Sequence, residues 1–339
     1  MSEHKALLTD TANRAFAALT GKFSADWRVI EEAGLPWVMA TEAAGGIGGG
    51  FEDACAILRA AGRHAVALPI AEAIVGAALL TETGLVMNGA LTLAKRAQGK
   101  LEARDGGFAF SGTLDDVAFG QECPRIATLI ERDDKSFVFA VTRDDAKAAT
   151  RKTDAADIPY DELRFAHAPV TAVESKRWTL DRLYRAMALA RACQIGGAID
   201  AALALSASHV TQRQQFGRPL AKFQAIQQQM AVLVEEGAAA NAAAEAAACA
   251  FDSGDAAFEM TAAKLRANRA AGEAASIAHQ VHGAIGFTRE YDLQRFTRRL
   301  WCWRSDYGNE RYWAAEIGTR AARTGADGFW AALVDGFAA

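Results

Sequence analysis

The segment from about residue 175 to residue 335 constrains the fold most, because alanine dominates it and few helix breakers interrupt it. Alanine has the highest intrinsic helix propensity, so this composition favours long helices over strands. The clearest breakers lie at Gly217-Arg218-Pro219, at Ser253-Gly254 and at Gly283 to Gly286, and they predict three long helices followed by shorter ones. Small side chains allow close helix packing, which favours an antiparallel four-helix bundle.

Two blocks with different local chemistry precede this helical segment. Residues 1–100 contain amphipathic runs such as Phe51 to Ala61, which predict an N-terminal helical domain. Residues 101–172 contain short β-branched and aromatic runs such as Phe137 to Val141, separated by turn formers, which predict a small β domain. The chain is therefore expected to be a multidomain α+β protein, with the helical bundle domain at residues 173–339.

Composition and charge exclude several classes of function. Hydrophobic residues make up 51% of the chain and charged residues 23%, which is ordinary for a globular protein. The net charge is −4 and no basic stripe stands out, so binding to nucleic acid has no electrostatic support. The first 20 residues lack the apolar core of a signal peptide, and the five cysteines lack zinc or disulfide spacing. We expect a cytoplasmic protein without a membrane partner or a bound metal.

Three further features have ordinary structural interpretations. The glycines from Gly45 to Gly50 lack a convincing preceding strand, so a loop between helices is favoured over a phosphate-binding loop. His279 and His282 lack a carboxylate or thiol at ligand spacing, which favours structural histidines over a metal site. An aromatic cluster near the C-terminus is expected at an interface. It consists of Trp301, Trp303 and Trp313.

Two motifs in the helical segment carry the strongest functional signal. The first is Arg213-Gln214-Gln215-Phe216-Gly217-Arg218-Pro219-Leu220, followed by Phe223-Gln224-Ala225-Ile226-Gln227. The second is Gln280-Val281-His282-Gly283-Ala284-Ile285-Gly286-Phe287. Both motifs resemble the flavin-binding signatures of acyl-CoA dehydrogenases, and they are separated as in that family. The order of helical domain, β domain and helical bundle is also similar. The resemblance implies FAD as the cofactor and α,β-dehydrogenation of an acyl-CoA thioester.

The resemblance also implies the residues that bind FAD. Arg213 is expected to form paired hydrogen bonds with the diphosphate, Phe216 to pack against the cofactor, and Gly217 to permit a tight turn. The implied contacts at the adenine-ribose end are Gln224 and Gln227, and those of the second motif are Gln280, Gly283 and Ala284, which replaces a glycine of the family. Arg213 also has an ordinary interpretation, as a cation that complements the dipole at the end of a helix. Gln224 and Gln227 could likewise be ordinary surface residues of an amphipathic helix.

The catalytic glutamate of the family has no counterpart in the alignment. Dehydrogenation needs a carboxylate that removes the α-proton while the flavin takes the β-hydride. Aligning Arg298 with the family's Arg-Asp-Ala-Arg segment puts Tyr307 at the glutamate position, and the alternative position on an earlier helix is Met187. Tyrosine, with an ordinary pKa near 10, is a poor base at neutral pH. The nearby carboxylates are Asp306 and Glu310.

The retained motifs and the missing glutamate suggest a shared site. The family's flavin-ring residues in the β domain are also missing, because Leu91 to Arg96 and Leu114 to Gly120 do not match them. The chain resembles the short subunit of heteromeric α2β2 acyl-CoA dehydrogenases similar to those acting on steroid side chains. A longer partner would then carry the base. Two alternatives are a homo-oligomer with a displaced carboxylate base and a catalytically silent scaffold subunit.

Overall fold

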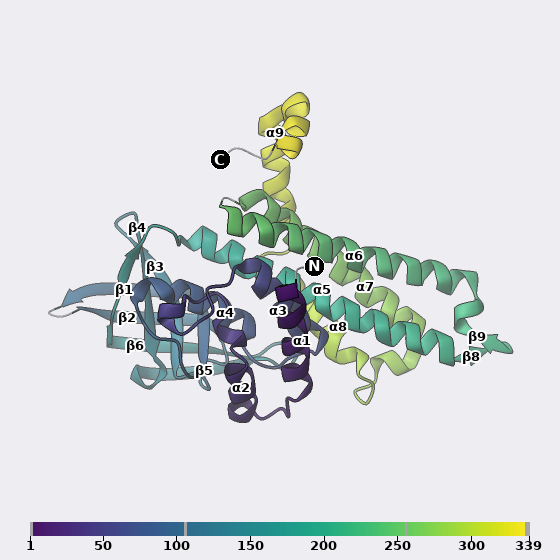
Figure 1. Ribbon diagram of the computed structural model, residues 1–339, viewed down its shortest axis with the longest axis horizontal. Coiled ribbons are helices and arrows are strands. Elements are labelled where there is room, and N and C mark those ends of the chain that lie inside the picture. The colour runs from purple at the N-terminus through teal and green to yellow at the C-terminus, as the bar shows by residue number, and fades with distance from the viewer. Residues whose placement is uncertain (1–2, 105–106, 255, 336–339) are drawn as a thin grey trace. The chain divides into compact units, whose positions relative to one another are not determined.

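The computed structural model describes residues 3–104, 107–254 and 256–335 (Figure 1). The chain divides into two compact units, one formed by residues 1–61 and 66–187 and the other by residues 62–65 and 188–339. Helices come first, strands follow, and long helices end the chain, which confirms the predicted fold class. The domain boundaries near residues 100 and 172 remain a prediction. The ends of the first and third predicted domains, residues 1–2 and 336–339, lie outside the described residues.

The first unit begins with helices, one of which is fully buried. Its α-helices are α1 (Glu3–Ala17), α2 (Phe23–Glu32), α3 (Phe51–Arg63) and α4 (Ile70–Leu80). Every residue of α4 is buried, and α4 packs against strands β1 (Leu91–Arg104) and β3 (Arg125–Arg132). The glycines from Gly45 to Gly50 form the predicted loop, which lies between the short 3-10 helix η2 (Glu42–Ala44) and α3.

The strands of the first unit form one seven-stranded sheet in the order β5-β6-β2-β1-β3-β4-β7. The remaining strands are β2 (Gly107–Ala118), β4 (Lys135–Thr142), β5 (Ala146–Thr153), β6 (Pro159–Val170) and β7 (Val173–Ser175). Strands β1 and β3 are parallel, and the other neighbouring strands of this sheet are antiparallel within the described residues. The rings of Phe110, Phe139 and Phe165 meet in its core, with centroids 5.3 and 5.9 Å from that of Phe110.

Two strands differ from the sequence-based expectation. Strand β1 begins at Leu91, inside the block predicted to be helical. The prediction missed this start because the buried run Leu91 to Ala94 is too short for its periodicity to distinguish a strand from a helix. Strand β5 is polar and is not among the β-branched and aromatic runs that predict the β domain. Seven of its eight residues are exposed, so no alternation of apolar and polar residues marks it, and only its backbone pairing with β6 defines the strand.

A buried carboxylate on β6 is held by an arginine on β5. Asp161 Oδ1 accepts a hydrogen bond from Arg151 Nε at 2.9 Å and one from Gln121 Nε2 at 2.7 Å. Burial raises the pKa of Asp161, but the hydrogen bonds from Arg151 and Gln121 lower it more, so this pKa lies below its ordinary value of 3.8. A depressed carboxyl pKa stabilises the fold above about pH 3.8, and this contribution is lost as the pH falls through the lowered value.

We therefore expect Arg151→Met to begin acid unfolding at a higher pH than the wild type. Circular dichroism during acid titration measures the shift. The control is Arg164→Met, which removes an exposed pair with Glu162 and should leave the acid midpoint nearly unchanged. Identical acid midpoints for the two variants would show that the Asp161 pair does not contribute in this way.

The second unit contains the predicted helical bundle. Its helices are the larger part of α5 (Leu180–Gln212), then α6 (Gln224–Ser253), α7 (Ala257–His282), α8 (Leu293–Ser305) and α9 (Glu310–Asp335). Helix α7 packs against α6, α8 and α9. A methyl group on Gly237 of α6 would lie 3.0 Å from the Ile199 side chain of α5, so a small residue is needed where these helices cross. Helix α9 has a kink at Gly325, where φ is 72°.

Helix α5 is long and apolar enough to cross a membrane, but 78% of its most apolar stretch is buried in the protein, as in the core helix of a globular protein.

The three tryptophans near the C-terminus have different environments. Trp303 and Trp313 are 6% and 0% exposed, whereas Trp301 is 45% exposed. The interface expectation is therefore wrong for Trp303 and Trp313, whose rings are packed within the chain itself. Sequence spacing alone could not distinguish these two environments.

Candidate functional site

The first motif forms a small β-hairpin between α5 and α6 (Figure 1). Strands β8 (Gln214–Gln215) and β9 (Arg218–Pro219) pair through the two-residue turn of Phe216 and Gly217. Both turn residues have positive φ, 50° and 77°, as a two-residue hairpin turn of type I′ requires. Glycine adopts this conformation freely, whereas phenylalanine does so at a cost. The turn holds the Phe216 side chain 92% exposed.

Backbone and ring contacts fix the hairpin on the helices. Arg213 follows the last residue of α5, its N–H donates to the His209 carbonyl at 2.8 Å, and its carbonyl accepts from the Leu220 N–H at 2.9 Å. The guanidinium of Arg218 lies 4.1 Å from the ring centroid of Phe223, and the Phe216 ring meets Phe223 edge to face at 6.2 Å. The hairpin is therefore ordered, while Arg213 is exposed.

Gln224 and Gln227 of the first motif are exposed at the start of α6. Gln224 is the first residue of that helix, and Gln227 lies one turn later. The Gln227 side chain donates from Nε2 to the Ala221 carbonyl at 2.9 Å, so it provides a hydrogen-bond donor for a carbonyl in the turn before the helix. Gln227 thus already has a structural role, whereas Gln224 forms no such side-chain hydrogen bond within the described part of the chain.

The second motif forms the end of α7 and the turn after it. Gln280 is exposed on the last turn of α7, and Gly283 ends the helix with a φ of 63°. A methyl group on Gly283 would meet no atom of the chain within 4 Å, so its backbone is open on that side. Ala284 is exposed in the following 3-10 helix η6 (Gly283–Phe287). These residues leave room for a group outside the chain to approach the backbone.

Two histidines bring the motifs together within the second unit. The imidazoles of His209 on α5 and His282 on α7 are stacked, with centroids 4.5 Å apart and planes inclined by 27°. His282 Nδ1 lies 2.7 Å from the Ala278 carbonyl, and its Nε2 lies 3.1 Å from the hydroxyl of Tyr291. Burial lowers the pKa of both histidines. Backbone hydrogen bonds to Ala278 and Leu205 partly offset the effect on His282, whereas nearby His282 and Arg213 lower the pKa of His209 further. Sequence reasoning missed His209 and Tyr291.

His279, about one turn before His282 on α7, belongs to a second aromatic stack. Its ring lies between those of Phe287 at 4.3 Å and Trp301 at 5.5 Å, and its Nε2 is hydrogen-bonded to Thr297 Oγ1 at 2.9 Å. Burial lowers its pKa. Among the described residues, no group of three or more His, Cys, Asp or Glu side chains is placed to hold a metal.

The residues at the family's glutamate position are engaged within the chain. Tyr307 is 4% exposed, and its carbonyl accepts a hydrogen bond from Trp313 Nε1 at 3.1 Å. Asp306 Oδ2 accepts from Arg191 Nε at 2.7 Å, and these two side chains are only 11% and 4% exposed. Glu310 forms an ion pair with Arg304. Asp306 would therefore have to leave a buried ion pair before it could accept a proton.

The turn that carries Tyr307 rests on a fully buried lysine. Lys264 Nζ donates to Asn268 Oδ1 at 2.6 Å and to the Trp303 carbonyl at 2.7 Å. Asn268 Nδ2 in turn donates to the Gly308 carbonyl at 3.0 Å. A cation at the C-terminal end of α8 satisfies carbonyl groups that the helix leaves unpaired. Sequence reasoning missed this support.

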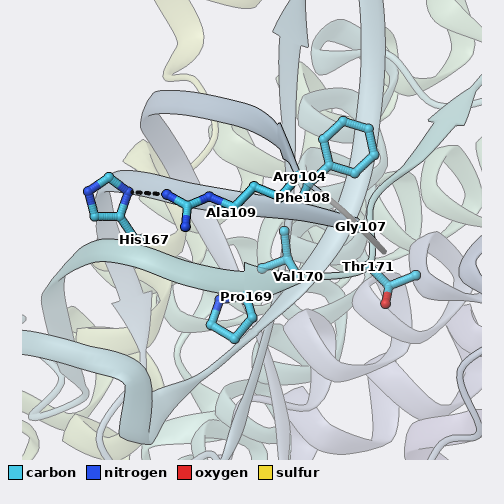
Figure 2. Close-up of a pocket in the computed structure, with 8 residues that line it drawn as sticks. All are labelled: Arg104, Gly107, Phe108, Ala109, His167, Pro169, Val170 and Thr171. Carbon is cyan, nitrogen blue, oxygen red and sulfur yellow. Dashed lines mark hydrogen bonds between the residues drawn. The ribbon is translucent and has the colours of Figure 1, made fainter.

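Surface cavities lie in the sheet of the first unit. Figure 2 shows one of about 320 Å³, in which the Arg104 guanidinium is hydrogen-bonded to His167 Nδ1 at 2.9 Å. Its lining residues are Arg104, Gly107, Phe108, Ala109, His167, Pro169, Val170 and Thr171. A second cavity of about 610 Å³ lies between residues 99–103 and 130–133. No residue of the two motifs lines either cavity.

Comparison with known proteins finds similarity to acyl-CoA dehydrogenases. Residues 178–318 match the C-terminal domain of acyl-CoA dehydrogenases. Acyl-CoA dehydrogenase FadE34 of Mycobacterium tuberculosis is 29% identical over 276 residues, which are 78% of this chain and 38% of that protein. The chain spans between 38% and 41% of the length of FadE34 and two further curated relatives.

Solved structures share the fold of the whole chain. The ChsE4-ChsE5 complex of Mycobacterium tuberculosis contains a chain with a TM-score of 0.85 and 22% identity, covering 96% of this chain and 99% of that one. A chain of the Tcur3481-Tcur3483 steroid ACAD has a TM-score of 0.82 and 24% identity, covering 94% and 97%. At these identities the likeness shows the fold.

Proposed function

We propose that this chain, whose residues 178–318 match the C-terminal domain of acyl-CoA dehydrogenases, is a subunit of an FAD-dependent acyl-CoA dehydrogenase, to which it contributes the part of the flavin site that reaches across a subunit interface. The observation that carries this proposal is the exposed hairpin. Arg213 and the 92% exposed Phe216 project from an ordered turn, although an isolated chain gains nothing by exposing a phenylalanine in a costly conformation.

The residues of the two motifs fit the chemistry of a flavin dinucleotide. The Arg213 guanidinium can donate two parallel hydrogen bonds to a diphosphate, and the Phe216 ring offers an apolar face. The open backbone at Gly283 permits close approach of phosphate oxygens, with the exposed Gln280 amide nearby in the sequence. FAD supplies hydride acceptance when bound. We propose Gln224, Gln227 and Ala284 as further, weaker contacts.

The state of the base position supports a partner subunit. Tyr307 is buried, and Asp306 is held by Arg191, so neither offers a carboxylate that is ready to remove an α-proton. A longer acyl-CoA dehydrogenase-like subunit would supply that carboxylate and the pocket of the flavin ring. The names ChsE4-ChsE5 and Tcur3481-Tcur3483 each denote a complex of two proteins, the latter a steroid ACAD. We therefore propose a cytoplasmic α2β2 assembly that acts on an acyl-CoA thioester with a steroid side chain.

Co-expression of this chain with its genomic neighbours of the same family tests the proposal. The purified complex is expected to hold FAD and to dehydrogenate acyl-CoA thioesters, and the chain alone to do neither. Full activity from the chain alone would favour a homo-oligomer with Asp306 or Glu310 as a displaced base. An active complex whose flavin content does not depend on Arg213 would favour a silent scaffold.

A further inference from the structure

The stacked histidines are the direct side-chain contact between the two helix ends that bear the flavin motifs. His209 lies four residues before Arg213, and its carbonyl accepts the Arg213 N–H at 2.8 Å. His282 lies directly before Gly283 and two residues after Gln280. The 4.5 Å stacking of their rings therefore couples the position of the Arg213 backbone to that of the Gly283 turn. Neither histidine has a role in the dehydrogenation itself.

The hydrogen bonds define a neutral form of this contact. His282 Nδ1 donates to the Ala278 carbonyl, so its Nε2 is the acceptor in the neutral ring, and the Tyr291 hydroxyl donates to it at 3.1 Å. The Tyr291 ring also packs on both imidazoles, with centroids 5.1 Å from His282 and 6.5 Å from His209. A proton on His282 Nε2 would turn this acceptor into a donor and force the hydroxyl to rotate.

The charged groups around the pair also disfavour protonation. Arg213, directly after α5, acts on His209, and His282 acts on both His209 and His279. Burial and the neighbouring Asp292 carboxylate raise the pKa of Tyr291, which lies in the loop before α8. Two protonated rings stacked at 4.5 Å, with the Arg213 cation directly after α5, would repel one another strongly.

We propose that His209, His282 and Tyr291 form an acid-sensitive positioning cluster, which holds Arg213 and the Gly283 turn in register for a dinucleotide diphosphate and releases them in acid. The inference rests on the proposed function only for the identity of the ligand. These residues touch no reacting group, so they are positioning residues.

The direction of the pH effect follows from the lowered histidine pKa values. Both rings bind protons less readily in the folded chain than in the opened one, whose histidines titrate near the ordinary value of 6.5. The closed cluster is therefore fully stable above about pH 6.5, and it loses stability as the pH falls below that value. The loss is complete once the pH lies below the folded-state pKa values of both His209 and His282.

Hydrogen exchange on the purified full chain tests this inference without requiring flavin. After correction for intrinsic exchange, the protection of residues 206–220 and 278–291 should fall by roughly tenfold or more between about pH 7.5 and pH 5. The single variant His209→Phe keeps an aromatic ring but cannot be protonated, so this acid loss should shrink markedly. His167→Asn, on strand β6 of the first unit, is the matched control and should keep the wild-type profile.

Equal protection at both pH values in the wild type would overturn the inference, and so would an unchanged acid loss in His209→Phe. If His209→Phe does not fold, Tyr291→Phe provides the second test, because loss of the hydroxyl donor should already lower protection of the two segments at pH 7.5. Unchanged protection in that variant would also overturn the inference. If protection falls in acid as expected but the complex never binds FAD, the proposed function alone would be contradicted.

Discussion

Replacing Arg213 with alanine is expected to lower the FAD affinity of the assembled complex by roughly 10- to 150-fold. A hydrogen bond to a charged group contributes about 1.5–3 kcal/mol, and each 1.4 kcal/mol corresponds to a tenfold change in affinity. Arg213 is exposed and forms no ion pair with any residue that the structure describes, so the substitution should leave the folded chain intact. Flavin absorbance after equilibrium dialysis measures the change.

Two further variants make the Arg213 experiment specific. Arg213→Lys keeps the charge but loses the paired donors of the guanidinium, so we expect an affinity between those of wild type and alanine variant. Arg269→Ala removes an exposed cation from α7, away from both motifs, and should bind FAD like the wild type. Equal flavin content in all four proteins would show that this chain does not touch the cofactor.

Replacing Asp306 with alanine is expected to destabilise the chain by about 3–5 kcal/mol, because it removes the carboxylate that faces the buried guanidinium of Arg191. Urea unfolding followed by circular dichroism measures the loss. The double variant Arg191→Met with Asp306→Leu replaces the ion pair by apolar side chains of similar volume and should recover most of the stability. An Asp306→Ala variant as stable as the wild type would contradict the structural role of the ion pair.

The Asp306 position also separates the two enzyme hypotheses. Asp306→Asn keeps a hydrogen-bonding side chain, so it should fold better than the alanine variant. If the base lies on a partner, the complex containing Asp306→Asn should reduce its flavin at the wild-type rate per bound FAD. Retained FAD with loss of flavin reduction would instead identify Asp306 as the base, because removal of a general base affects rate rather than cofactor affinity.

The helical parts of the fold were predictable because breakers are local signals. Gly254 and Gly283 directly follow the last residues of α6 and α7, and Gly217 lies in the hairpin turn between α5 and α6. The start of β1 at Leu91 and the whole of β5 were not predictable. A short buried apolar run fits either helix or strand, and an exposed edge strand has no apolar face to reveal its period.

The candidate site was predictable only where a motif is continuous in the sequence. The motif residues from Arg213 to Gln227 and from Gln280 to Ala284 could be named directly. The Arg191–Asp306 pair joins residues 115 positions apart, and Lys264 reaches a carbonyl 39 positions away. The stacking of His209 on His282 likewise depends on how α5 and α7 pack, which a single sequence does not specify.

The FAD content of the purified proteins tests the central claim most directly. Absorbance of released flavin, divided by the amount of this chain, should give one FAD per copy in a complex with its partner subunit. The isolated chain should give a value close to zero. Stoichiometric FAD in the isolated chain, together with dehydrogenation of an acyl-CoA thioester, would contradict a flavin site completed across a subunit interface.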